Sequence, residues 1–178
     1  MLDTSQWSEL AIASFQSAGG RRMPLVRSVA NCEAGKSLLR FSPRELFPRS
    51  REPDAVLAGL LLYLNCWDDA HNIAQDIPTA DGSYWHAIIH RMEPDPANSG
   101  YWFRRVGRHA IFPDLQTRAE AIAQQHPDSG LTAADPWDAF RFIEYCGTAN
   151  SRPGSECAQA ALEMQQAEWE LLMQWCHG

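Results

Sequence analysis

The sequence predicts an all-α protein, a single-domain helical bundle or short helical array of about seven to nine helices. From Asp54 onward, apolar residues recur every three to four positions in one segment after another. Pro, Gly and Asp interrupt these segments where helices are expected to begin and end. The period-two alternation of half-buried strands is nearly absent, so we expect little or no sheet.

The length of 178 residues favours one domain that spans residues 1–178. Hydrophobic residues make up 45% of the chain and charged residues 21%, which is typical of a globular rather than a disordered protein. Within this domain we expect an irregular N-terminal part, residues 1–52, with two or three helices, and a helical core at residues 53–178.

Two helices of the N-terminal part can be predicted from local signals. The first has apolar residues at helical spacing and ends at a glycine pair, with Trp7, Leu10, Ala11 and Phe15 followed by Gly19 and Gly20. A short helix should follow Ser42, because Ser-Pro-Arg-Glu is a capping box with Pro at the first helical position.

The core should contain seven consecutive helices. Their predicted ranges are 54–66, 68–77, 82–93, 95–106, 114–126, 135–146 and 155–176. Gly107 and Gly147 stand where a helix commonly ends in a left-handed residue, so we expect both to follow a helix.

Charge and hydropathy exclude several classes of partner. A net charge of −7 argues against a general nucleic-acid binder, which needs a positive face toward phosphate. The longest apolar run, Ala55 to Leu64, is about half the length of a membrane span and predicts a core helix rather than a membrane protein. The N-terminus has neither the basic nor the apolar region of a secretion signal, so we expect a cytoplasmic protein.

The cysteine pattern agrees with that location. The five cysteines form no Cys-x-x-Cys pair, and an odd number cannot all pair within one chain: Cys32, Cys66, Cys146, Cys157 and Cys176. This pattern is typical of reduced thiols, so we expect all five to be free.

Three histidines in the centre of the chain are predicted to converge. His86 and His90 form a stripe on the helix 82–93, about 100° round from its apolar face, and Glu93 continues this stripe. His71 has the same rotational offset on the preceding helix. If the two helices pack antiparallel with their apolar faces together, His71 meets the other histidines, and Asp68 falls level with Glu93.

Such a set predicts a metal site. Neutral imidazoles and carboxylates suit zinc, iron or manganese, so the candidate ligands are His71, His86, His90, Glu93 and Asp68. Glu93 and Asp68 are also the candidate catalytic residues, as general bases. The segment is not a zincin motif, because Ala87 stands in place of its glutamate. The alternative is that the histidines brace the helix pair through hydrogen bonds to carboxylates or carbonyls.

Aromatic and arginine residues next to the histidines predict a ligand groove. Guanidinium groups bind carboxylates or phosphates in bidentate fashion. The candidate binding residues are Trp85, Arg91, Tyr101, Trp102, Arg104, Arg105 and His109. The arginines could instead pair with neighbouring acidic residues and stack on the aromatic rings.

Three functions follow from these features. The first is a small binding or scaffold domain whose groove receives a small anionic ligand or a peptide. The second is a metal-dependent enzyme, hydrolytic or oxidative, that uses His71, His86 and His90. The third, more remote, is nucleotide binding through Ala30–Ser37, a relaxed P-loop pattern in which Ala replaces the first Gly.

The segment DDAHNIAQDIPTADGSYWHAIIHRMEPDPANSGYWFRRVGRHAIF and the C-terminal EMQQAEWELLMQWC together resemble a family of bacterial and fungal proteins of unknown function. Its members carry a Trp-His-x-x-x-His-Arg-x-Glu block and then an Asn-x-x-Tyr-Trp-x-Arg-Arg-x-Gly block. The resemblance covers roughly Ala55 to Cys176 and implies an all-helical fold, without an activity. Ala110 departs from the proline of the family pattern. The Tyr-Trp-Phe-Arg-Arg stretch also resembles the second helix of tetratricopeptide or Sel1-type repeats.

Overall fold

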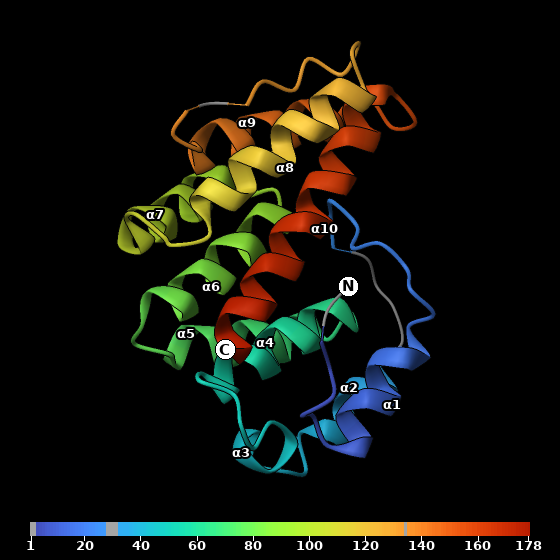
Figure 1. The fold of residues 1–178 in the computed structure, drawn as a ribbon, viewed down its shortest axis with the longest axis vertical. Coiled ribbons are helices and arrows are strands. Elements are labelled where there is room, and N and C mark those ends of the chain that lie inside the picture. The colour runs from blue at the N-terminus through green and yellow to red at the C-terminus, as the bar shows by residue number, and fades with distance from the viewer. Residues whose placement is uncertain (1–2, 28–31, 134) are drawn as a thin grey trace.

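The computed structural model describes residues 3–27, 32–133 and 135–178, and it is all-helical (Figure 1). The described residues form ten helices and no strand. The helices are α1 Glu9–Ser17, α2 Glu33–Leu38, α3 Pro43–Leu46, α4 Pro53–Tyr63, α5 Trp67–Asp76, α6 Ala80–Met92, α7 Pro96–Val106, α8 Phe112–Gln125, α9 Ala139–Asn150 and α10 Glu156–His177.

All seven predicted core helices are present, as α4 to α10, with ends displaced by at most four residues. The largest displacement is in α9, which starts at Ala139 because the Asp138 carboxylate accepts the backbone N–H groups of Phe140 and Arg141. Gly107 ends α7 with a φ of 64°, as predicted. The prediction for Gly147 was wrong: α9 continues past it to Asn150, because Ala149 is buried and anchors the last turn.

The described residues of the N-terminal part form three helices, α1 to α3. The Ser8 hydroxyl accepts the Ala11 backbone N–H and begins α1. The capping box of α3 is complete, since the Ser42 hydroxyl accepts the Glu45 N–H while the Glu45 carboxylate accepts the Ser42 N–H. These side-chain caps satisfy backbone N–H groups at the starts of α1 and α3, whereas α2 begins without a side-chain cap.

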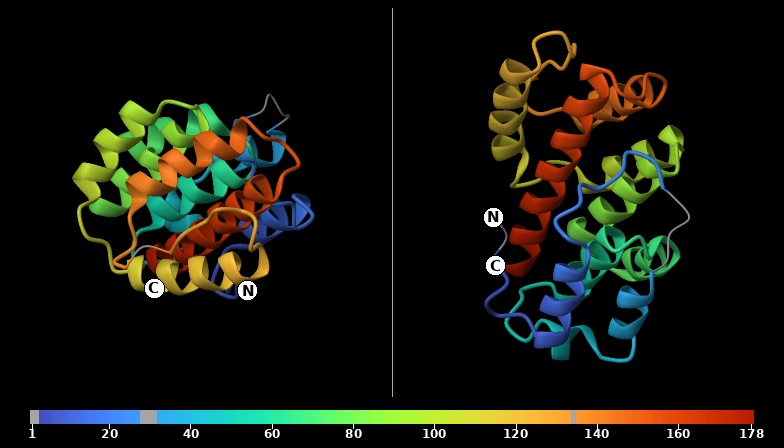
Figure 2. Two further views of the ribbon diagram at one scale, coloured as in Figure 1. Left: turned by 90° about the horizontal axis from the view of Figure 1, so that it is seen from above. Right: turned by 90° about the vertical axis from the view of Figure 1, so that its right-hand side faces the viewer.

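Helix α6 lies at the centre of the fold. It packs against α4, α5 and α7, and its residues from Asp81 to Met92 are all buried. The long α10 runs beside α4, α8 and α9, as the two further views show (Figure 2). Helix α5, which carries His71, packs against α4 and α6.

Tight packing fixes α4 against α6 and α10. Gly59 of α4 has no side chain, and a Cβ there would lie 2.5 Å from Met173 Sδ and 2.6 Å from Trp85 Cζ2. The Trp169 indole N–H donates to the Gly59 carbonyl at 2.8 Å. Because Gly59 has no side chain, both Trp85 and Trp169 can pack directly against the backbone of α4.

A buried ion pair also joins α6 to α10. The Arg91 guanidinium donates to the Glu168 carboxylate, and the Tyr84 hydroxyl donates to the same carboxylate at 3.0 Å. Both charged side chains are at most 1% exposed. Among the helices that the structure describes, none combines the length and apolar character needed to cross a bilayer.

Candidate metal centre

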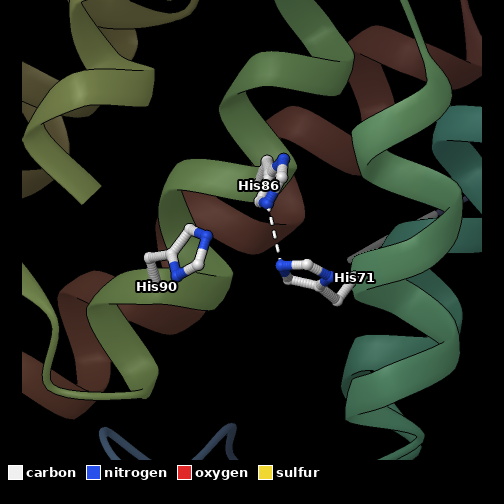
Figure 3. Close-up of side chains that lie close together, drawn as sticks. All are labelled: His71, His86 and His90. Atoms are coloured by element: carbon white, nitrogen blue, oxygen red, sulfur yellow. Dashed lines mark hydrogen bonds between the residues drawn. The ribbon is translucent and has the colours of Figure 1, made fainter. Parts of the chain in front are cut away.

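The three histidines converge as the rotational argument predicts. His71 comes from α5, and His86 and His90 come from α6, and the three rings face one another (Figure 3). The ring centroid of His71 lies 4.4 Å from that of His86 and 5.2 Å from that of His90. His86 and His90 are buried and His71 is half-buried. The α5–α6 pair therefore places three imidazoles around one point.

The spacing of the ring nitrogens fits one metal ion. One nitrogen from each ring lies within 4.8 Å of the others. Metal–nitrogen distances of about 2.0–2.1 Å in a tetrahedral site require nitrogens about 3.3 Å apart. The Nε2 atoms of His71 and His86 are already 2.9 Å apart, joined by a hydrogen bond. The ring nitrogens would have to approach by at most about 1.5 Å to reach the tetrahedral spacing.

His86 is held in its neutral form. Burial, with a smaller effect from the neighbouring His71 and His90 rings, lowers its pKa to about 3. Its Nδ1 atom is buried and has no hydrogen-bond partner among the described residues. A neutral, desolvated imidazole has a free lone pair near neutral pH, which is the form that binds metals.

His90 is oriented by a carboxylate. Its Nδ1 lies 3.2 Å from Glu93 Oε2, and Glu93 also lies 3.7 Å from an Arg27 guanidinium nitrogen. Burial lowers the pKa of His90, although Glu93 opposes this effect. A ring that donates from Nδ1 to a carboxylate presents its Nε2 lone pair outward, as in many metal sites. With Nδ1 donating to Glu93, that Nε2 atom accepts a hydrogen bond from the Asn98 amide nitrogen at 3.1 Å, and a metal ion bound at Nε2 would replace this contact.

Two tryptophans stack on the histidines. The Trp67 ring lies against His71, with centroids 5.3 Å apart, and the Trp102 ring lies against His86 at 3.9 Å. Each indole also carries a guanidinium group over its ring, from Arg27 at 4.4 Å for Trp67 and from Arg105 at 5.2 Å for Trp102. Two indole rings therefore pack against the histidines, and two positively charged guanidinium groups lie on the outer faces of these rings.

The structure separates the predicted carboxylates. Glu93 lies beside the histidines, but its contact is with His90 rather than with the point where the three rings meet. Asp68 is exposed and lies outside the convergent group. Asp68 was expected to fall level with Glu93. Although it is three residues before His71 and within about 60° of it round α5, its side chain is exposed and contributes no atom to the group.

The predicted groove needs three corrections. Trp85 is fully buried against α4 and lines no surface. Arg91 is buried and pairs with Glu168 rather than with a ligand or a nearby acid. His109 is buried, with Nε2 2.8 Å from Asp81 Oδ1, so its polar edge is occupied.

The remaining predicted groove residues lie at the surface. Trp102 is half-buried, and the other three are exposed: Tyr101, Arg104 and Arg105. A groove of about 840 Å³ does open beside α7, but His109 and Phe140 line it, and Trp102 and Arg105 do not. Trp102 and Arg105 therefore border the histidine centre, through the stacking of Trp102 on His86 and of Arg105 on Trp102.

The segment proposed for nucleotide binding has no P-loop geometry where it is described. Ala30 and Asn31 lie outside the described residues. From Cys32 to Ser37 the chain enters α2, and no strand precedes it in the described part of the chain. Lys36, which would have to reach a phosphate, lies 3.8 Å from Glu33. Phosphate binding by such a loop needs a strand before the helix. The described residues therefore give no support to nucleotide binding through this segment.

Sequence reasoning missed several neighbours of the centre. Trp67 precedes His71 by four residues on one helix, and side chains at this spacing are in contact. The sequence could therefore have predicted this contact. Asn98 and Arg27 come from other segments, and no local pattern points to them. All five cysteines are free in the structure, as expected.

Comparison with known proteins returns no family model, no curated protein and no solved structure that matches the chain. The function must therefore be argued from the residues of the site.

Proposed function

We propose that the protein binds a divalent transition-metal ion through His71, His86 and His90, with zinc as the first candidate and iron or manganese as alternatives. The observation that carries this proposal is the convergence of three imidazole nitrogens within 4.8 Å, from two helices, with two of the rings buried. Burying two imidazoles beside a half-buried third costs free energy that apolar core residues would not. A bound ion, attracted by all three lone pairs, offsets that cost.

A set of three histidines leaves one position of a tetrahedral ion open. Structural zinc sites use four protein ligands, whereas catalytic sites use three and keep a position for water or substrate. An ion at this point would supply a Lewis acid and a bound water of lowered pKa. This favours the metal-dependent function, with hydrolytic or oxidative chemistry, over a purely scaffolding one.

Charge around the centre favours a small anionic ligand at the open position. Three neutral imidazoles leave the charge of a divalent ion uncompensated. Arg27 and Arg105 add positive charge beside it, of which Glu93 offsets part through its contact with Arg27. A carboxylate or phosphate group would complete both the coordination and the charge balance.

Within this proposal, Glu93 is a positioning residue. Its carboxylate is occupied by His90 Nδ1 and Arg27, so it fixes the ring that binds the metal. We therefore propose that Glu93 orients His90, rather than acting as the general base suggested by the sequence. We place the protein in the cytoplasm, where thiols such as the five free cysteines stay reduced.

Metal content tests the proposal. The full chain, produced without a histidine tag and stripped with chelator, is equilibrated with zinc, and bound metal is counted by mass spectrometry. His71→Asn and His86→Asn should each lose one equivalent of metal relative to the wild type. His126→Asn is the matched control, because that histidine pairs with Glu163 away from the centre. Equal zinc content in the His71, His86 and His126 variants, with circular dichroism showing all three folded, would refute the proposal.

A further inference from the structure

A second group of metal-ligating side chains lies on another face of α5. It consists of Cys32, Cys66 and Asp69, whose two sulfur atoms and one carboxylate oxygen all lie within 4.8 Å of one another. Cys32 stands at the start of α2, and Cys66 at the start of α5. Asp69 is about 200° round α5 from His71, so the two groups do not share a ligand or a face.

The packing of α2 on α5 brings these groups together. A Cβ at Gly35 would lie 2.2 Å from Cys66 Sγ, so only a glycine lets α2 approach the sulfur this closely. The Cys66 thiol is buried and donates to the Cys32 carbonyl oxygen at 3.2 Å. Cys32 and Asp69 are half-buried, which leaves a side from which an ion can enter.

We infer that Cys32, Cys66 and Asp69 form a second metal site, selective for a thiophilic divalent ion such as zinc and independent of the histidine centre. Zinc–sulfur bonds of about 2.3 Å place two sulfurs about 3.8 Å apart in a tetrahedral site, within the spacing already present. Two thiolates and a carboxylate are a soft, anionic set, which favours zinc over magnesium or calcium.

Binding at this site exchanges protons for the ion. Two thiols and one zinc ion give two zinc–thiolate bonds and two released protons, with no change of oxidation state. Burial raises the pKa of the Cys66 thiol, so metal binding must supply the free energy of its deprotonation. Lys36 lies on the next turn of α2, and its positive charge lowers the pKa of the Cys66 thiol. The same charge offsets part of the negative charge of the three ligands. Because two protons leave for each zinc ion bound, zinc affinity at this site should fall as the pH is lowered.

The test uses the full chain, reduced and without a histidine tag, loaded with zinc or cobalt. Cobalt bound by thiolates gives a charge-transfer absorption band in the near ultraviolet, which imidazole ligands do not give. The wild type should show this band, and Cys32→Ser and Cys66→Ser should each lose it together with one equivalent of zinc. Asp69→Asn should keep the band and bind zinc more weakly.

Two controls separate this site from the histidine centre and from general unfolding. Cys157→Ser changes a buried cysteine outside the group and should keep both the band and the zinc content. His71→Asn should lose its own equivalent of metal and keep the thiolate band. As a check that needs no variant, zinc should protect Cys32 from alkylation in the wild type.

Three outcomes would overturn the inference. One is a cobalt-loaded wild type without the thiolate band. Another is a band that persists in both Cys32→Ser and Cys66→Ser. The third is a protein equilibrated with zinc in which the two cysteines are joined by a disulfide, with the mass lowered by two hydrogens.

Discussion

Replacing Glu168 with glutamine should destabilise the protein more than any surface change, because it leaves the Arg91 charge buried without its partner. Both side chains are at most 1% exposed. Burial alone would lower the pKa of Arg91, but the Glu168 carboxylate outweighs this effect and raises it, so the guanidinium stays charged. Two of its nitrogens, Nε and Nη1, have no hydrogen-bond partner among the described residues. The carboxylate is therefore the main compensation for this charge.

The size of the effect follows from the cost of an unpaired buried charge. Breaking a buried ion pair by removing one partner costs about 3–5 kcal/mol of unfolding free energy. Glu168→Gln keeps the shape and one carbonyl acceptor for the Tyr84 hydroxyl, which lies 3.0 Å away, so the loss reports the charge rather than a cavity. Replacing both Arg91 and Glu168 with methionine should recover much of that loss, because a well-packed apolar pair needs no compensation.

Equilibrium urea unfolding at neutral pH, followed by circular dichroism, measures these differences. The matched control is Glu170→Gln on the same helix, a half-buried carboxylate that accepts a hydrogen bond from Gln166. It should change the unfolding free energy by less than about 1 kcal/mol. If Glu168→Gln costs no more than Glu170→Gln, the ion pair does not hold α6 to α10 and the reasoning is wrong.

Two further predictions concern the buried histidine and the closest helix contact. His86 has a folded-state pKa of about 3, below its ordinary value of 6.5, so its contribution to the stability of the metal-free protein is present above about pH 6.5 and is lost as the pH falls toward the folded value. From about pH 7 to pH 5 this contribution should fall by about 2 kcal/mol in urea unfolding, and His86→Gln should remove that part of the pH dependence; an unchanged dependence would contradict the assignment. Gly59→Ala should cost about 1–3 kcal/mol by the same measurement, because its Cβ would overlap Met173 and Trp85. An alanine that is tolerated without loss would show that these side chains can move aside.

The sequence was sufficient for α1, α3, the seven core helices and the histidine centre, because these depend on local periodicity and capping, but it gave no range for α2. His71, His86 and His90 lie within two adjacent helices, so a rotational argument and one assumption about packing brought them together. Gly147 shows the limit of local signals: glycine permits a helix to end but does not force it, and the burial of Ala149 carries α9 onward.

Contacts between distant segments could not be predicted in this way. Arg91 was expected to face a ligand, yet its partner is Glu168, 77 positions along the chain. Cys32 meets Cys66 only because Gly35 lets α2 lie against α5, and no periodicity in the irregular N-terminal part indicates that approach. Which side of an amphipathic helix is buried can be read locally, but the element that covers it depends on the whole fold.

The most direct test of the central claim is the coordination shell of the ion in the histidine centre. X-ray absorption spectroscopy on zinc-loaded Cys32→Ser/Cys66→Ser protein removes the thiolate ligands proposed for the second site and leaves the first. The account predicts three imidazole nitrogens at about 2.0–2.1 Å from zinc and one further light ligand. A shell without imidazole scattering, or a zinc spectrum unchanged when His86 is replaced with asparagine, would contradict it.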